Sequence, residues 1–198
     1  MSVLKKKCNY VEIGLWCILL IVCYLAYRYI LYDYLLRTIF FSYSHIIYVH
    51  VIAIFILTYL SRVCLFIIQY KYIKHIHVFY LKWIYFIVLI YILFFKTIGL
   101  QGYELDPLSF LWEIQNGSIS YPVMNILCFI PIGFMIKQMK KQWIYIILGL
   151  LLIETVQYTG HLGIFDFGDC ITNFIGILIG YGFSQLKIYQ TITSNYIR

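Results

Sequence analysis

The stretch ETVQYTGHLGIFDFGDCITNFIGILIGYG, residues 154–182, decides how this chain is organised, because polar side chains lie beside an apolar run. Glu154 and Gln157 end one apolar segment, and Asp169 and Asn173 begin the next. A charged side chain at the centre of a bilayer costs roughly 2.5–3.5 kcal/mol even on the lenient insertion scale. Each of these residues therefore needs either a structural or a functional explanation.

The composition of the whole chain indicates a membrane protein. Of 198 residues, 63% are hydrophobic and only 12% are charged, about half the charged share of an average soluble domain. A bilayer core about 30 Å thick takes roughly 20 apolar residues per helix. We predict an all-α, polytopic transmembrane helix bundle that forms one membrane domain over residues 1–198. The expected spans are 12–34, 46–69, 81–99, 122–136, 143–159 and 170–186.

The distribution of charge predicts the orientation of these spans. The net charge is +7, and the cations gather at alternate ends of the spans, which favours membrane topology over nucleic-acid binding. With six spans, four groups of Lys and Arg at the ends of the spans all fall on one side, so both termini are predicted to be cytoplasmic. The basic groups are Lys5–Lys7, then Lys71, Lys74 and Lys82, then Lys137, Lys140 and Lys141, and finally Lys187 and Arg198. The opposite side receives Asp33, Glu104, Asp106, Glu113, Asp166 and Asp169, and for Glu104 and Glu113 topology alone is a sufficient explanation.

The six cysteines show neither a CxxC pair nor an accompanying His-x-x-x-His spacing. Most lie inside apolar runs, where a free cysteine behaves as a small hydrophobic residue. We expect no metal site, no other cofactor and no disulfide framework.

The fourth predicted span, 122–136, contains Pro131, which removes one backbone donor and frees the carbonyl of Leu127. A kink or a break is expected there. The half-apolar stretch before this span, residues 101–122, is predicted either to lie along the outer membrane surface or to fold partly back between the helices.

Polar residues near residues 154–173 form the candidate site. Glu154 and Gln157 lie on one helical stripe, which reaches His161 if the helix continues that far. Asp169 is a reasonable N-cap for the last span, and Glu154 has Arg28, Arg62 or Lys96 as conceivable partners for its charge. Capping and pairing do not require so many convergent groups, so we favour a binding function for the cluster. Its members are Asn125, Glu154, Gln157, His161, Asp166, Asp169 and Asn173.

Four further residues near the cluster have structural explanations. Gly176 and Gly180 form a small-xxx-small motif that lets two helices pack closely. We assign these two glycines, with Gly133 and Pro131, to helix packing or to the kink.

Three ordered motifs in residues 101–183 resemble the VanZ-like family. NILCFIPIGF (125–134) resembles the family's Asn-x-x-x-Phe-x-Pro-x-Gly-Phe helix, ETVQ (154–157) its Glu-x-x-Gln, and DFGDCITNFIG (166–176) its aspartate-rich turn and Asp-x-x-x-Asn-x-x-Gly. The family-like core is placed at 101–186, after three extra spans over 12–99. Family members often have an arginine between the Gln and the Asp pair, where this sequence offers only His161.

The resemblance implies a multi-pass protein of the bacterial plasma membrane, with a role in the cell envelope linked to tolerance of the glycopeptide teicoplanin. The preferred hypothesis is a protein, not an enzyme, that binds a membrane lipid or lipid-linked envelope component at the outer leaflet. The alternatives are an intramembrane enzyme acting on an envelope lipid through Glu154 and Asp169, and a small lipid transporter. No known catalytic constellation and no inverted repeat is evident in the sequence.

Overall fold

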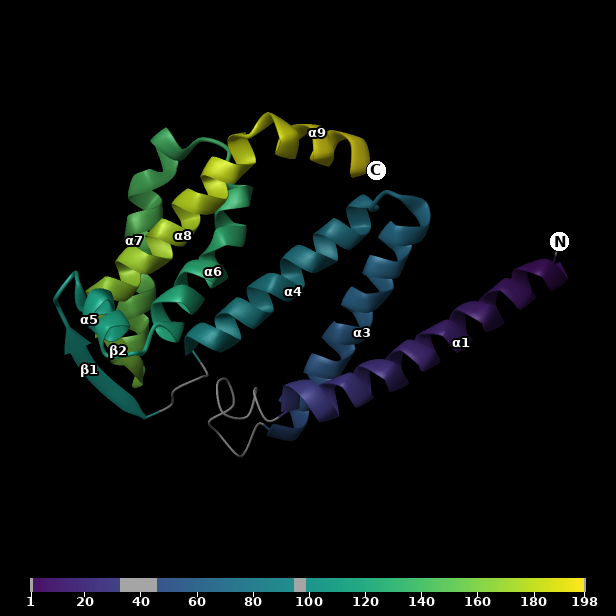
Figure 1. The fold of residues 1–198 in the computed structure, drawn as a ribbon, viewed down its shortest axis with the longest axis horizontal. Coiled ribbons are helices and arrows are strands. Elements are labelled where there is room, and N and C mark those ends of the chain that lie inside the picture. Colours follow the sequence, from purple (N-terminus) through teal and green to yellow (C-terminus); the bar gives the residue numbers. More distant parts are fainter. Residues whose placement is uncertain (1, 33–45, 95–98, 198) are drawn as a thin grey trace. The chain divides into compact units, whose positions relative to one another are not determined.

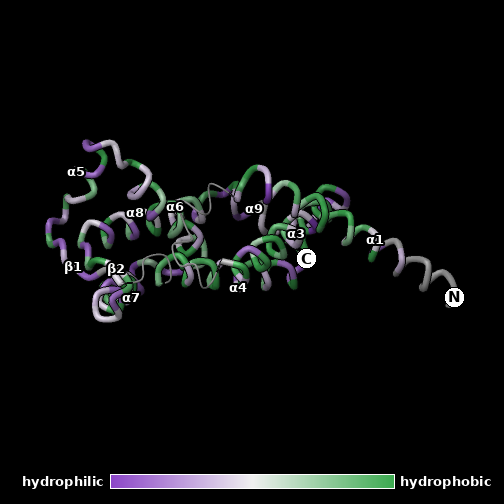
Figure 2. The backbone as a smooth tube through the Cα atoms, turned by 90° about the horizontal axis from the view of Figure 1, so that it is seen from below, coloured by the Kyte–Doolittle hydropathy of each residue, from purple (hydrophilic) through white to green (hydrophobic). Residues whose placement is uncertain are grey.

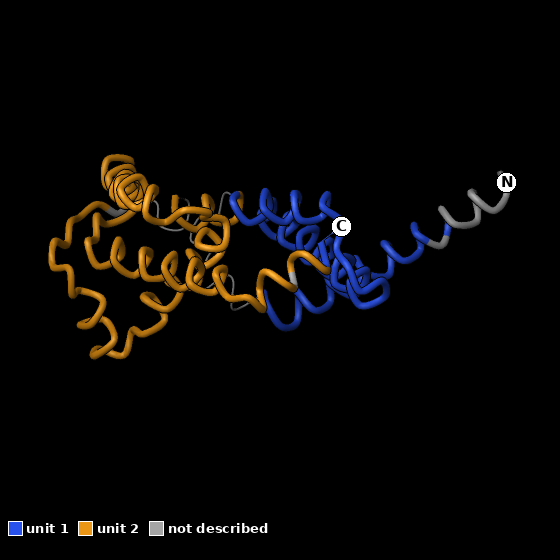
Figure 3. The backbone as a smooth tube through the Cα atoms, turned by 90° about the horizontal axis from the view of Figure 1, so that it is seen from above, with its two compact units in different colours: residues 1–86, 196–198 blue, residues 87–195 orange. Residues whose placement is uncertain are grey.

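The computed structural model describes residues 2–32, 46–94 and 99–197, and these fold predominantly into α-helices (Figure 1). Contacts divide the chain into two compact units, residues 1–86 with 196–198, and residues 87–195 (Figure 3). Each unit is described by itself. The predicted positions of Asp33 and Lys96 lie outside the described residues.

The first unit contains α1 (Ser2–Ala26), which continues into a short π-helix η1 (Tyr27–Leu31), then α3 (Ile46–Tyr70) and the first part of α4 (His75–Phe94). α1 packs against α3, with Cys23, Tyr27 and Val63 buried. The hydroxyl of Tyr27 and Nδ1 of His50 form a hydrogen bond that joins η1 to α3. These helices leave much of their apolar surface exposed, as expected for surfaces that face lipid.

The second unit alternates helices with two short strands. After α4 come β1 (Leu100–Glu104), α5 (Ser109–Gln115), α6 (Ser120–Met135), α7 (Met139–Thr159), β2 (Leu162–Asp166), α8 (Phe167–Gln185) and α9 (Lys187–Tyr196). β1 and β2 pair in parallel, from Leu100 opposite Leu162 to Glu104 opposite Asp166. The sequence had predicted neither strand.

The most extensive helix–helix contact in this unit joins α6 and α8. A Cβ atom on Gly176 would collide with the backbone carbonyl of Ile126, and one on Gly180 with that of Ile130. Reciprocally, Gly133 of α6 lies against the backbone of α8. The three glycines therefore allow the two helix backbones to approach more closely than any side chain would permit.

The segment before α6 folds against the helices. α5 contacts both α6 and α8, while Leu105, Leu108 and Trp112 are more than half exposed. Both predicted arrangements of residues 101–122 fit these contacts and exposures, so the choice between them stays a prediction. α6 runs from Ser120 to Met135 as one helix through Pro131, so no break occurs there, and the kink stays a prediction.

In the part of the chain that the structure describes, four helical segments are long and apolar enough to cross a membrane. They are Glu12–Leu31, Ile47–Tyr70, His75–Phe94 and Met139–Thr159, and α6 is a shorter apolar helix. α3 and α4 are mostly hydrophobic along their length, whereas hydrophilic residues gather around β1 and α5 (Figure 2). The chain is therefore a helical membrane protein, and the total of six spans stays a prediction.

The sequence predicts a span at 170–186. The helix α8 begins earlier, at Phe167, and includes the polar residues Asp169, Thr172 and Asn173. Thr172 and Asn173 are buried, and so do not face lipid. α4 and α7 also begin before their predicted spans, at His75 and Met139 instead of residues 81 and 143.

Candidate functional site

Glu154 of α7 is the most deeply buried carboxylate of the cluster, with 2% of its surface exposed. Its Oε2 accepts a hydrogen bond from the backbone N–H of Asp166 at 3.3 Å, which ties α7 to the end of β2. A buried carboxylate needs such donors, because burial removes the water that would otherwise solvate it.

The sequence offers three conceivable partners of opposite charge for Glu154. The structure pairs one of them, Arg62, with another acid, Glu12. Nη2 of Arg62 lies 3.1 Å from Oε1 of Glu12, and this is the ion pair found among the described residues. The guanidinium of Arg28 lies over the ring of Tyr32 at 4.5 Å from its centroid. The pairing of Glu154 with a cation stays a prediction, and the contact that the structure shows for its carboxylate is the hydrogen bond from the backbone of Asp166.

Asp166 is the N-cap of α8, and the prediction that Asp169 has this role is wrong. The backbone of Asp166 is extended, and its Oδ1 accepts a hydrogen bond from the N–H of Gly168 at 2.7 Å. The same Oδ1 accepts a hydrogen bond from Oγ of Ser109 in α5 at 2.8 Å. The sequence signal was ambiguous, because both aspartates precede the apolar run and the helix begins at the earlier one.

Asp169 lies instead in the first turn of α8, where a negative charge is favoured by the unpaired N–H groups. Its Oδ1 accepts a hydrogen bond from Nδ2 of Asn125 in α6 at 2.7 Å. Two residues that are 44 positions apart in the sequence thereby link α6 and α8 at this end of the unit.

Asn173 lies one turn further along α8 and is 2% exposed. Its side-chain Oδ1 is buried and has no hydrogen-bond partner among the described residues. Leaving a buried acceptor unsatisfied costs about 1–3 kcal/mol. A group that donates a hydrogen bond at this position would recover that cost.

Gln157 and His161 do not join the other five residues. Nε2 of Gln157 donates to the backbone oxygen of Leu93 at 2.7 Å, and so satisfies a carbonyl in the last turn of α4. α7 ends at Thr159, so the expected stripe from Glu154 to His161 is interrupted. His161 is exposed, with a positive φ of 54°, and lies at the opposite end of β2 from Asp166, about 16 Å away along the strand.

A cavity of about 510 Å³ lies beside the cluster and shares Asp166 with it, and Ser109, which donates a hydrogen bond to Asp166, also lines the cavity. Among the described residues, four carboxylates and no lysine or arginine line the cavity. The carboxylates are Glu104, Asp106, Glu113 and Asp166. Trp112 and Tyr121 are the aromatic residues of its wall. The sequence had explained Glu104 and Glu113 by topology alone. The pairing of β1 with β2, which places Glu104 opposite Asp166, was not predicted.

Among the acids of the cavity, Glu113 differs in having a carboxylate oxygen, Oε2, that is buried without a hydrogen-bond partner among the described residues. Burial, and then the nearby carboxylate of Asp166, raise the pKa of Glu113 above its usual value. The wall therefore offers acceptors and negative charge to a ligand, which suits hydroxyl groups or an amine better than phosphate.

Within residues 2–32, 46–94 and 99–197, no group of three His, Cys, Asp or Glu residues is arranged to hold a metal ion.

The sequence model of the family described as VanZ/LLP1 matches residues 80–188, which is more than half of the chain. This range includes every residue of the cluster and of the cavity. No curated protein and no solved structure matches the chain.

Proposed function

Since the chain belongs to the VanZ/LLP1 family, we propose that it is a cell-envelope protein of the bacterial plasma membrane that binds the polar head of an amphiphilic or lipid-linked ligand. The binding site is the cavity lined by Asp166, together with the buried cluster of Asn125, Glu154, Asp169 and Asn173 behind it. The observation that carries the proposal is the buried Oδ1 of Asn173, which has no hydrogen-bond partner among the described residues.

The lining of the cavity narrows the class of ligand. Carboxylates accept hydrogen bonds from sugar hydroxyls, and the exposed ring of Trp112 offers a flat apolar face to a sugar ring. A bare phosphate would be repelled by four acids without a lysine or arginine among the lining residues. We therefore propose a sugar-like or amine-bearing head group, with the lipid chain of the ligand in the adjacent membrane.

The predicted topology places this cavity on the outer side of the membrane, because the acidic loops lie opposite the basic ones. A site there meets lipid-linked envelope components and glycopeptide drugs with lipid tails. The link to teicoplanin tolerance that the resemblance implies fits such a location, and it belongs to this proposal.

A binding experiment tests the ligand class. The protein in nanodiscs is titrated with a polyprenyl-linked disaccharide and with the polyprenyl phosphate that lacks the sugar. We expect saturable binding of the sugar-bearing lipid and at least tenfold weaker binding of the phosphate alone, which corresponds to about 1.4 kcal/mol. Equal affinity for both lipids would contradict the proposal.

A set of variants tests the residues. Glu154→Ala, Asp169→Ala and Asn173→Ala are each expected to abolish teicoplanin tolerance in cells at unchanged protein levels. Thr155→Ala is the matched control, because Thr155 neighbours Glu154, is exposed, and donates only to the Leu151 carbonyl of its own helix. Full tolerance in all three cluster variants would refute the proposal. Release of a product from the lipid-linked sugar by the purified protein would favour the enzymatic alternative instead.

A further inference from the structure

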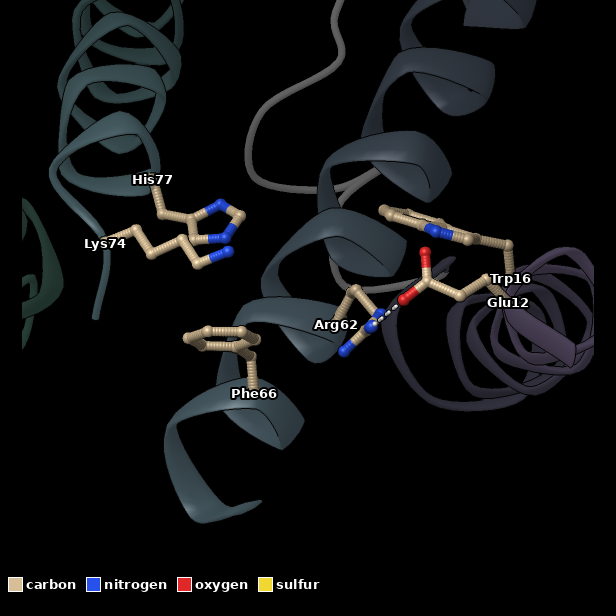
Figure 4. A pocket seen from close by; sticks show the side chains of 6 residues that line it. All are labelled: Glu12, Trp16, Arg62, Phe66, Lys74 and His77. Carbon is tan, nitrogen blue, oxygen red and sulfur yellow. Dashed lines mark hydrogen bonds and ion pairs between the residues drawn. The ribbon is translucent and has the colours of Figure 1, made fainter. Parts of the chain in front are cut away.

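A second pocket lies in the first unit, and all of its lining residues precede residues 80–188, which the family model matches. It has a volume of about 220 Å³ and is lined by residues of α1, α3 and the beginning of α4. Figure 4 shows Lys74 and His77 reaching toward α3 from one side, and Glu12 and Trp16 facing it from α1. The lining residues are Glu12, Trp16, Arg62, Phe66, Lys74 and His77.

Arg62 is a membrane-embedded cation. It lies eight residues before the end of α3 at Tyr70, which is about 12 Å along the helix. Its side chain is 16% exposed, and Nη2 donates to Oε1 of Glu12 at 3.1 Å. A guanidinium has five N–H donors, so this single contact orients Arg62 and leaves donors for another acceptor.

Lys74 provides a charge that no carboxylate of the described residues neutralises, since Arg62 and Glu12 form the ion pair found there. Its ammonium lies 5.3 Å from the centre of the Phe66 ring, where a cation–π interaction holds it over the pocket. His77 is held in turn by a hydrogen bond between its Nδ1 and the hydroxyl of Tyr59, at 3.0 Å. With one acid against two permanent cations, the pocket has a net positive charge.

The surroundings of the pocket are apolar. Trp16 and Phe66 line it, and the neighbouring faces of α1 and α3 expose Ile13 and Leu65 toward the predicted bilayer. Lys71, Lys74 and Lys82 also assign this end of the helices to the cytoplasmic side. A basic pocket between membrane helices at that side matches the chemistry of a phosphate head group attached to acyl chains.

We propose that the Arg62–Lys74 pocket binds the phosphate head group of an anionic phospholipid from the inner leaflet. Lys74 and the free N–H groups of Arg62 contact the phosphate oxygens, and Glu12 holds the guanidinium in place. Trp16 and Phe66 contact the glycerol and the first methylenes of the acyl chains. This site is independent of the proposed outer-leaflet cavity.

Native mass spectrometry of the full-length protein in detergent tests the proposal, with phosphatidylglycerol and phosphatidylcholine as probes. We expect phosphatidylglycerol to be retained preferentially by the wild-type protein. Lys74→Gln should weaken its binding about fivefold, which is the contribution of one basic residue near an anionic lipid. Lys82→Gln removes the same charge from an exposed position of α4 that does not line the pocket, and should change binding by less than twofold.

Further measurements separate lipid binding from other outcomes. Arg62→Gln leaves Glu12 without its partner, so the double variant Glu12→Gln with Arg62→Gln tests the site without that unpaired charge. It should also bind phosphatidylglycerol at least fivefold more weakly. Equal retention of the two lipids, or equal losses in Lys74→Gln and Lys82→Gln, would overturn the proposal. Displacement of the lipid by millimolar inorganic phosphate would identify a soluble anion as the ligand instead, and would also overturn it.

Discussion

The side-chain amide of Asn125 donates to the carboxylate of Asp169 across 2.7 Å, and so joins the start of α8 to the first half of α6. Each of these residues belongs to one of the sequence motifs on which the resemblance to the family rests. Their hydrogen bond shows that two motifs that are far apart in the chain form one structural unit.

The stability of the protein should fall when a second negative charge is placed in the Asn125–Asp169 pair, and should recover when the two residues are exchanged. Asn125→Asp places two carboxylates together, and we expect it to lower the free energy of unfolding by about 1.5–3 kcal/mol, the value of a charged hydrogen bond. The double variant Asn125→Asp with Asp169→Asn restores one amide and one carboxylate, and should recover much of the melting temperature in detergent. A double variant no more stable than Asn125→Asp would contradict a direct interaction.

Substitution of the contact glycines should separate α6 from α8. Gly176→Ala and Gly180→Ala each place a methyl group against a backbone carbonyl of α6. Because backbone cannot rotate away as a side chain can, we expect a loss of roughly 1–3 kcal/mol for each variant. Thermal unfolding in detergent should show melting temperatures lower by about 2–4 °C per kcal/mol.

Gly182→Ala is the matched control for these variants, because it lies on the same helix and a Cβ there would meet nothing within 4 Å. Alanine also favours helix over glycine by about 1 kcal/mol, so this variant should be neutral or stabilising. An equal loss of stability in Gly182→Ala would show that the added methyl group destabilises the protein without a contact to α6, and would contradict this explanation.

A substitution at Ser109 should compensate for the loss of stability that a substitution at Gly168 causes. A Cβ on Gly168 would collide with Oγ of Ser109, so Gly168→Ala is expected to displace α5 and to lower the melting temperature. Ser109→Gly in the same protein removes the obstructing side chain and should restore part of the loss. Limited proteolysis near residues 105–118 reads out the docking of α5 directly, and unchanged cleavage in Gly168→Ala would refute this account.

Glu113 should make stability depend on pH. Its pKa in the folded protein is raised above the unfolded value, so the folded state loses stability as the pH rises through the folded-state pKa. Glu113→Gln cannot ionise, so its melting temperature should equal that of the wild type at about pH 4 and exceed it at about pH 8. The measurement is thermal unfolding in one detergent across that range of pH.

Glu104→Gln controls for the charge of the cavity, since Glu104 is an exposed member of the same wall. It should give a smaller gain at high pH than Glu113→Gln. If both variants gained stability equally, the net charge of the cavity, and not the burial of Glu113, would be the cause.

Local sequence patterns predicted some features of the fold. The apolar runs predicted a helical membrane protein, because the number of consecutive apolar residues measures directly what a bilayer can accommodate. The spacing Gly176-x-x-x-Gly180 predicted close helix packing without naming the partner. The N-cap was assigned to Asp169 instead of Asp166, because the pattern alone does not show at which aspartate the helix starts.

The sequence by itself thus determined the membrane character of the chain, the order of its motifs and most members of the polar cluster. Only the tertiary structure decided that Asn125, Glu154, Asp166 and Asp169 meet while Gln157 and His161 do not. It also decided that β1 pairs with β2 and brings Glu104 into one cavity with Asp166. The physical reason is that hydrophobic periodicity is local, whereas these contacts join residues that lie far apart in the chain and leave no periodic signal.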